Sequence, residues 1–267
     1  MSQQIKRRYN WKRDRLDPRD HLYKVGHPLA PQAALPSVVD LSPACSPVRD
    51  QGEMGCCSGF ALAGAYEYLE LMDLKAKMTL AGAPEMFDLT QFSEVSELFI
   101  YYGERVLEGT VNEDSGAEIR DGIKVLARLG VCRETLWPYA DTNLLKQPVQ
   151  AAYDEAAQHK VIQYQRLNIL DDIRHCLASG FPVAFGFDVY ANFESDYCAK
   201  TGDLQMPASG EPLVGGHAVL AVGYDDNARK LKIRNSWGPE WGLAGYFTMP
   251  YEYVDQGLAS DFWTIRK

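Results

Sequence analysis

Small and apolar side chains recur on one face of a predicted helix that begins near residue 57. They are three or four residues apart, at Cys57, Phe60, Ala61, Gly64, Ala65, Tyr68, Leu71 and Met72. This spacing is typical of an amphipathic helix, which we expect to run to about Lys77. The preceding residues, 42–47, include two prolines and are expected to form a loop.

The same helical period continues through the first half of the chain. It predicts, in order, a helix over 93–107, a helix over 115–129 and a short helix over 150–157. Gly130 would end the second of these, and residues 79–90, which contain Gly, Pro and Asp, are expected to be a loop. Residues 45–135 are therefore predicted to form a mainly helical lobe.

The second half of the chain shows the patterns of strands. Alternating or continuous apolar runs predict strands over 161–167, 182–189, 217–224, 230–234, 245–249 and 260–265. One more helix, 170–179, is expected to end at Gly180. Residues 160–267 should then form a curled or barrel-like sheet that faces the helical lobe, which makes the predicted fold class α+β.

Composition excludes several broad classes of protein. The chain has 267 residues, of which 46% are hydrophobic and 24% charged, as in ordinary globular domains. No apolar run approaches the 18 or so residues of a membrane span, and the N-terminus lacks the apolar core of a secretory signal peptide. We therefore expect no membrane partner and a cytoplasmic location, or export without such a signal. The five histidines and six cysteines show no metal-ligand spacing, so no metal or cofactor is expected.

Charge separates the first 34 residues from the rest. They hold eight Lys or Arg and three Asp, which gives a net charge of +5. The net charge of the whole chain is −9, so residues 35–267 carry −14. Such an arm could dock on the acidic body as a lid or short propeptide and bury side chains such as Tyr9 and Trp11 against it. Alternatively, it could be a solvated leader. Nucleic-acid binding would depend on this arm alone, and we do not expect it.

Three separated residues suggest nucleophilic catalysis. A Gly-containing loop delivers Cys57 to the first turn of a helix, where free N–H groups favour a thiolate, although a buried cysteine is also ordinary there. His217 heads an apolar strand and Asn235 follows another. Each is unremarkable alone, but a Cys, a His and an Asn together form a nucleophile, a base and an orienter of that base.

The local motifs around these residues resemble those of papain-like cysteine peptidases. Gln51 lies six residues before Cys57, His217 opens a His-Ala-Val strand, and residues 235–246 read Asn-Ser-Trp-Gly, then Trp-Gly, then Gly-Tyr. The His and Asn fall 160 and 178 residues after the Cys, beyond the roughly 130–150 usual for the family, which insertions would explain. The resemblance runs from about Leu35 to the C-terminus, and the leader resembles those of bacterial members.

This resemblance implies a fold and a set of site residues. The fold would be two-lobed, with a helical N-terminal lobe, an antiparallel barrel-like C-terminal lobe and the active-site cleft between them. Cys57 would be the nucleophile and His217 the base, held by Asn235, while Gln51 would help to form the oxyanion hole. The residues implied in substrate binding are Ser115, Gly116, Gly216, Ala218, Trp237, Ser260 and Asp261. Among these, Ala218 would line the pocket for the side chain two residues before the cut, and Asp261 at its base would favour a basic one.

The chain departs from the family pattern at three places. Cys56 adjoins the nucleophile, but the offset from Gln51 favours Cys57. Ser58 stands where a Trp normally follows the nucleophile, which puts substrate preference in doubt. Met54 replaces a disulfide cysteine whose partner segment is also missing, as a reducing compartment allows.

We therefore expect a monomeric endopeptidase that acts on proteins or peptides. Two alternatives remain open: an enzyme that transfers acyl groups to amines, as transglutaminases do, and a catalytically inactive binding module.

Overall fold

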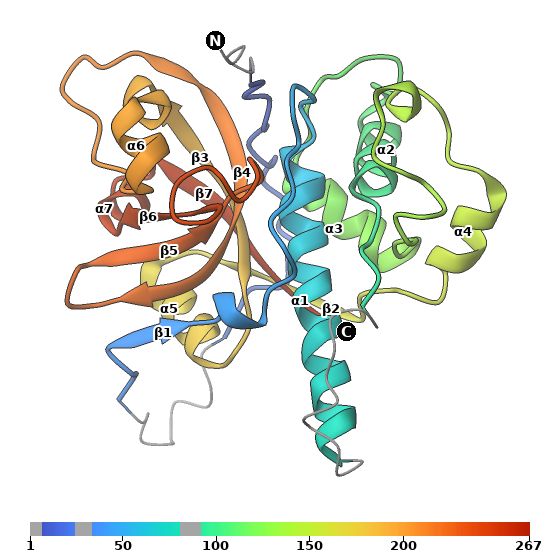
Figure 1. Cartoon of the computed structure of the whole chain (residues 1–267), viewed down its shortest axis with the longest axis horizontal. Coiled ribbons are helices and arrows are strands. Elements are labelled where there is room, and N and C mark those ends of the chain that lie inside the picture. Colours follow the sequence, from blue (N-terminus) through green and yellow to red (C-terminus); the bar gives the residue numbers. More distant parts are fainter. Residues whose placement is uncertain (1–6, 25–33, 81–91) are drawn as a thin grey trace.

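The helices and the sheet form two lobes that meet along one long helix. The computed structural model describes residues 7–24, 34–80 and 92–267. Helix α1 (Cys57–Leu80) stands between the sheet on one side and the other helices of the first lobe on the other (Figure 1). Those helices are α2 (Glu97–Glu108), α3 (Ile119–Arg128) and α4 (Gln150–Ala156). This is the predicted α+β class.

Helix α1 is buried on all sides over its first half. Every residue from Cys57 to Leu71 is buried, because helices α2 and α3 cover one face and the sheet covers the other. Two of these residues are acidic, and each has a cationic partner: Glu67 lies 2.9 Å from Arg49, and Glu70 lies 2.6 Å from Arg133. Burial of a charge without such a partner would be strongly unfavourable.

One antiparallel sheet forms the second lobe. Its strands are β1 (Val38–Asp40), β2 (Gln163–Leu167), β3 (Val183–Tyr190), β4 (Leu213–Asp225), β5 (Lys230–Arg234), β6 (Tyr246–Pro250) and β7 (Ala259–Arg266). The order is β2-β7-β3-β4-β5-β6, with β1 paired to β4. Helices α5 (Leu170–Ala178), α6 (Asp196–Thr201) and α7 (Glu252–Asp255) complete this lobe, and the phenylalanines of β3 lie in its apolar core.

Several element boundaries differ from the predicted ones. Helix α2 begins four residues later than predicted, because the Ser96 side chain caps it by accepting from the Phe99 N–H. Helix α3 also begins later, since Gly116 has φ +69, which is outside the helical region. Helix α1 continues through Leu80, and the remainder of the predicted 79–90 loop lies outside the described residues. Strand β1 and the short helices α6 and α7 were not predicted.

The six cysteines are all free thiols. The disulfides usual in secreted papain-like peptidases are therefore absent, as the sequence suggested. Over the described ranges, no helix is both long and apolar enough to cross a membrane.

Candidate active site

The thiol of Cys57 lies at the first residue of α1, against strand β4. Cys57 is 1% exposed and belongs to the same apolar cluster as Ala218 of β4. Burial raises the pKa of the thiol to about 12, and the neighbouring backbone of Ala218 opposes this shift. Neighbouring Cys56 faces the helical lobe instead, where its sulfur lies 3.1 Å from the hydroxyl of Tyr139.

The imidazole of His217 lies one residue before Ala218 and is completely buried. Its Nε2 lies 2.9 Å from Oδ1 of Asn235, which the strand-to-loop segment after β5 delivers. The ring of Trp237 stacks on the imidazole, with centroids 5.2 Å apart and planes 28° apart. Burial lowers the pKa of His217 to about 4, opposed by the Asn235 hydrogen bond.

The other ring nitrogen of His217 remains unused. Nδ1 is buried and has no hydrogen-bond partner among the described residues. Because Asn235 Oδ1 also accepts from the Ser236 N–H at 2.9 Å, this oxygen is an acceptor and Nε2 carries the proton. Nδ1 is therefore the nitrogen that is free to exchange a proton with a nearby group.

Two hydrogen bonds fix the side chain of Gln51, and its backbone N–H makes a third. Its backbone N–H donates to the Ser236 carbonyl at 2.9 Å, and its Oε1 accepts from the Ser236 hydroxyl at 2.5 Å. Its Nε2 donates to the Met54 carbonyl at 2.9 Å and has a second hydrogen that this bond does not use. Gln51 and Asn235 are thus held by the same loop.

A buried carboxyl group that sequence reasoning missed lies beside the thiol. The Ser58 hydroxyl donates to Glu104 at 2.7 Å, and both residues are fully buried. Burial raises the pKa of Glu104 to about 8, and its proximity in turn raises the pKa of Cys57. Nothing local in the sequence links Glu104 to Ser58, which lies 46 positions away.

The N-terminal arm, here residues 7–24, lies between the two lobes across this site (Figure 1). On the sheet side, the Trp11 N–H donates to the Gly216 carbonyl at 3.0 Å, and the Gly216 N–H donates to the Tyr9 carbonyl at 3.2 Å. On the helical side, the Lys12 N–H donates to the Ala117 carbonyl at 3.2 Å. The arm therefore bridges both lobes through its backbone.

Side chains of the arm cover the imidazole and its tryptophan. The ring of Tyr9 contacts those of His217 and Trp237 with centroids 6.2 Å and 6.1 Å away. The guanidinium of Arg7 lies 5.3 Å from the centre of the Trp237 ring and pairs with Asp50. With these contacts in place, the site is closed to solvent.

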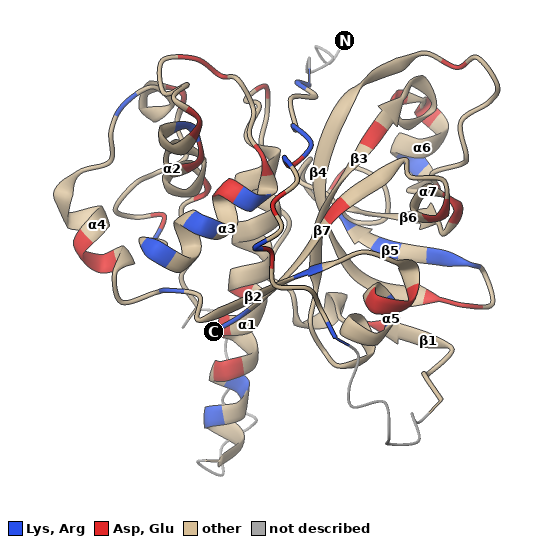
Figure 2. Cartoon of the chain, turned by 180° about the vertical axis from the view of Figure 1, so that it is seen from behind, with Lys and Arg blue, Asp and Glu red and all other residues tan. Residues whose placement is uncertain are grey.

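Opposite charges run along the arm and the body on both sides (Figure 2). The arm's cations pair with acids of either lobe, as in Arg8–Asp114 at 3.1 Å, Lys12–Glu108 at 2.5 Å, Arg13–Asp188 at 2.8 Å and Arg15–Glu118 at 3.4 Å. Exposed pairs of this kind contribute little individually. Their common sign nevertheless orients the basic arm on the acidic body.

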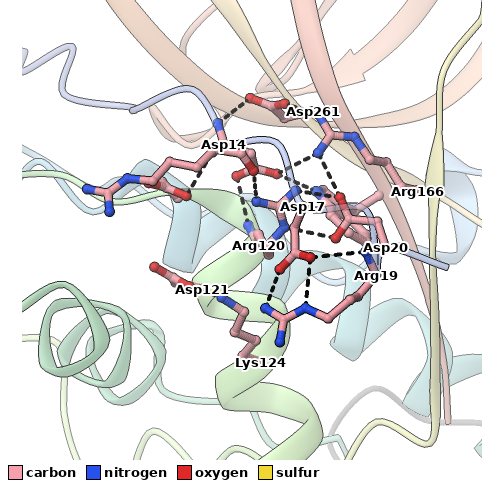
Figure 3. A network of polar contacts seen from close by, with 12 residues as sticks. Asp14, Asp17, Arg19, Asp20, Arg120, Asp121, Lys124, Arg166 and Asp261 are labelled. Carbon is pink, nitrogen blue, oxygen red and sulfur yellow. Dashed lines mark hydrogen bonds and ion pairs between the residues drawn. The ribbon is translucent and has the colours of Figure 1, made fainter. Parts of the chain in front are cut away.

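A buried ionic network fixes the middle of the arm (Figure 3). Asp20 pairs with Arg120 of α3 and, at 3.0 Å, with Arg166 of β2. Arg166 also pairs at 2.5 Å with Asp261, which accepts the Asp14 N–H at 2.8 Å. We refer to these five residues as the arm latch.

The residues expected to bind substrate have different partners in the structure. The Ser115 hydroxyl donates to Thr110, and the Gly116 N–H donates at 2.9 Å to Tyr101. Ser260 lies directly opposite Gly186 of β3, while Asp261 belongs to the arm latch. Gly216, Ala218 and Trp237 lie around His217, as described above.

Comparison with known proteins identifies relatives over most of the chain. Residues 35–262 match the family model described as papain family cysteine protease. The chain is 42% identical over 243 residues to an uncharacterized peptidase C1-like protein of Acanthamoeba polyphaga mimivirus, covering 87% of this chain and 73% of that one. It is 28% identical to pro-cathepsin H of Bos taurus over 80% of this chain and 59% of the relative.

Among solved structures, one similar chain is xylellain, a cysteine protease from Xylella fastidiosa. Its TM-score is 0.84 at 40% identity, with 100% of this chain and 98% of that chain covered.

Proposed function

The chain belongs to the papain family of cysteine proteases, and we propose that it is an endopeptidase in which Cys57, His217 and Asn235 form the catalytic triad. The observation that carries the assignment is the 2.9 Å bond from His217 Nε2 to Asn235, which leaves Nδ1 buried and unpartnered among the described residues. That nitrogen is available to take the proton of the thiol.

In the proposed reaction, the Cys57 thiol gives its proton to Nδ1 of His217 and attacks the peptide carbonyl. The imidazolium then protonates the leaving amine, and a water activated by the imidazole hydrolyses the thioester. The neutral hydrogen bond from Asn235 keeps the ring oriented without adding a charge. Stacking by Trp237 keeps water away from that hydrogen bond.

The oxyanion of the intermediate needs hydrogen-bond donors that are fixed before the reaction begins. Gln51 meets that need, because its amide is anchored to Ser236 and Met54 and retains a free hydrogen. We assign the second donor to the Cys57 backbone N–H, which lies among the unpaired N–H groups of the first turn of α1.

We further propose that residues 1–34 are an N-terminal extension, of which the described part, residues 7–24, closes the site, and that residues 35–267 are the catalytic domain. The arm excludes solvent from Cys57 and His217, and burial disfavours both the thiolate and the imidazolium. The docked form is then an inactive form, and the arm must leave the cleft before a peptide can enter.

An epoxide-type thiol inhibitor followed by mass spectrometry tests the nucleophile. In a version that lacks residues 1–34, in which the proposed site is open, the adduct is expected on Cys57; it should persist in Cys56→Ser and be lost in Cys57→Ser, and the full chain should react more slowly. A peptide blocked at both ends should be cut internally, which an exopeptidase cannot do. Incorporation of an added amine without hydrolysis would instead establish acyl transfer, and the absence of any adduct would favour the inactive binding module.

A further inference from the structure

The carboxyl group of Asp114 connects the loop before α1 with the loop between α2 and α3. Its two oxygens accept the Gly55 N–H at 3.1 Å and 2.9 Å, and one of them also accepts the Tyr101 hydroxyl at 2.7 Å. The Asp114 side chain is 8% exposed. Hydrogen bonds to a carboxylate are stronger than those between neutral groups, so this contact holds the two loops together. We call Asp114, Gly55 and Tyr101 the carboxylate clamp.

The clamp reaches the Gln51 side chain through a single peptide group. The Gly55 N–H and the Met54 carbonyl belong to the same peptide, which is planar and trans, so they point in opposite directions. Asp114 accepts the N–H on one side, and on the other side the carbonyl accepts Nε2 of Gln51 at 2.9 Å. The orientation of the Gln51 amide therefore depends on where Asp114 holds this peptide.

A second branch of the clamp reaches the segment beneath the arm. The Tyr101 hydroxyl, which donates to Asp114, accepts the Gly116 N–H at 2.9 Å. Tyr101 is fully buried, and burial together with the Asp114 carboxylate raises the pKa of its hydroxyl, which therefore keeps its proton and can donate. A Cβ on Gly116 would lie 1.8 Å from the Asn10 carbonyl oxygen, so the arm backbone lies directly on this glycine.

The clamp lies where a disulfide of papain-like peptidases is missing. Met54 stands at one of the two cysteine positions, and residues 113–116 correspond to the segment of the other. The buried Arg105 fixes this second segment from inside, because its guanidinium donates to the carbonyls of Val111 at 3.4 Å and Glu113 at 3.1 Å. Hydrogen bonds thus join the two segments without the oxidising compartment that a disulfide needs.

Building on the proposed function, we propose that Asp114 is a positioning residue for the oxyanion hole. It acts on the donor Gln51 through the peptide of Met54 and Gly55. Arg8 of the arm also pairs with Asp114 at 3.1 Å, but the Arg8 side chain is 53% exposed. The clamp bonds come from the helical lobe itself, so they remain when the arm leaves the cleft.

The kinetic test uses the full chain with Trp11→Ala as the parent. Trp11 is 6% exposed and its ring lies on Gly186, where an added Cβ would overlap it, so the substitution should loosen the arm. Leu16→Ala is the matched arm control, since Leu16 is 93% exposed. On the Trp11→Ala parent, Asp114→Ala should lower kcat for a blocked peptide amide by about 10²-fold, the cost of a small misplacement of a catalytic group. Glu113→Ala removes a neighbouring exposed acid and should leave kcat and KM unchanged.

A double-mutant cycle separates positioning from general destabilisation. Because Asp114 acts through Gln51, adding Asp114→Ala to Gln51→Ala should cost almost nothing further in kcat, whereas independent effects would multiply. Tyr101→Phe keeps the bonds from Gly55 to Asp114 and should leave kcat nearly unchanged. Multiplying effects in the cycle, or an unchanged kcat in Asp114→Ala, would overturn the proposal. An equal loss of kcat in Tyr101→Phe would also overturn it.

Thermal unfolding of each variant shows whether it is folded. Asp114→Asn provides the second variant, and it replaces Asp114→Ala in the cycle if the Ala variant does not fold. Its single amide oxygen can still accept the Gly55 N–H, but the amide nitrogen cannot accept the Tyr101 hydroxyl. We expect a loss of kcat between those of the parent and Asp114→Ala, and parent-like kinetics in every folded Asp114 variant would contradict the proposal.

Amide hydrogen exchange followed by mass spectrometry tests the clamp without a substrate. In the full chain, Asp114→Ala should speed exchange at residues 52–57 more than elsewhere, and Glu113→Ala should not. If no variant hydrolyses peptides but this exchange pattern holds, the peptidase assignment fails and the clamp stands. Hydrolysis by the parent with unaltered exchange at residues 52–57 in Asp114→Ala would remove the clamp and leave the peptidase.

Discussion

The Arg120 backbone N–H in the first turn of α3 donates a 3.0 Å hydrogen bond to the carboxyl group of Asp14, in the arm. The same carboxyl accepts from the Trp263 indole at 2.7 Å and is buried between the two lobes. Burial, together with the nearby Asp261, raises the pKa of Asp14 to about 7. Docking of the arm is therefore linked to binding of a proton by Asp14.

Arm docking is predicted to weaken as the pH rises. The docked Asp14 binds its proton more tightly than the free arm, whose Asp has an ordinary pKa near 3.8. Docking is therefore strongest below that value, and the equilibrium should fall by about tenfold per pH unit up to about pH 7. Limited proteolysis of the arm between pH 4 and 8 measures this, provided the protease is active throughout that range. Asp14→Asn is the matched neutral control and should flatten the profile, and tighter docking at high pH would contradict the prediction.

Opening the arm is predicted to make Cys57 more acidic. Burial is the main cause that raises the pKa of this thiol to about 12 and lowers that of His217 to about 4. Both shifts disfavour the charged pair, so admitting solvent should move the alkylation midpoint to lower pH. The rate of iodoacetamide alkylation against pH, in Trp11→Ala and in Leu16→Ala, provides the measurement. Superimposable profiles would show that the arm does not control the thiol.

Removing the proposed oxyanion donor is predicted to lower kcat with little change in KM. Gln51→Ala should reduce kcat by about 10²–10³-fold, the usual cost of one such donor. Because Gln51 also accepts from Ser236 at 2.5 Å, the melting temperature must be followed alongside. Gln51→Glu keeps the acceptor but lacks the donor, and it should be nearly as impaired as Gln51→Ala. A change confined to KM would remove Gln51 from the oxyanion hole.

Replacing Glu104 is predicted to affect stability in a pH-dependent way. The pKa of Glu104 is raised to about 8 by burial, so its contribution is fully present below pH 4.5 and is lost as the pH rises toward 8. Glu104→Gln, which still accepts from Ser58, should match the parent protein at pH 5 and exceed it at pH 9. Glu104→Ala also leaves the Ser58 hydroxyl unpaired and should be about 1–3 kcal/mol less stable than Glu104→Gln at both pH values. Urea unfolding at the two pH values compares them, and equal losses at pH 5 would contradict this account.

The sequence by itself determined the elements and the motif residues. Helix α1 and strands β3 to β7 follow from local periodicity. Residues on the buried face of a helix recur every three or four positions, and those on the buried face of a strand recur every two. The offset from Gln51 to Cys57 and the runs at His217 and Asn235 are also local, so the candidate triad could be named without coordinates. The first residues of α2 and α3 could not be predicted from periodicity. The cap formed by Ser96 and the non-helical backbone of Gly116 set these starts.

Only the tertiary structure decided how the distant parts meet. The bond between Asp14 and Asp261 joins residues 247 positions apart, and that between Ser58 and Glu104 joins residues 46 apart. The charge of the arm suggested that it could dock, but only the coordinates seat Trp11 on Gly186. No local pattern encodes such pairs, because each depends on how two lobes and an arm pack together and exclude water. That exclusion also produces the shifted pKa values of Cys57, His217 and Glu104.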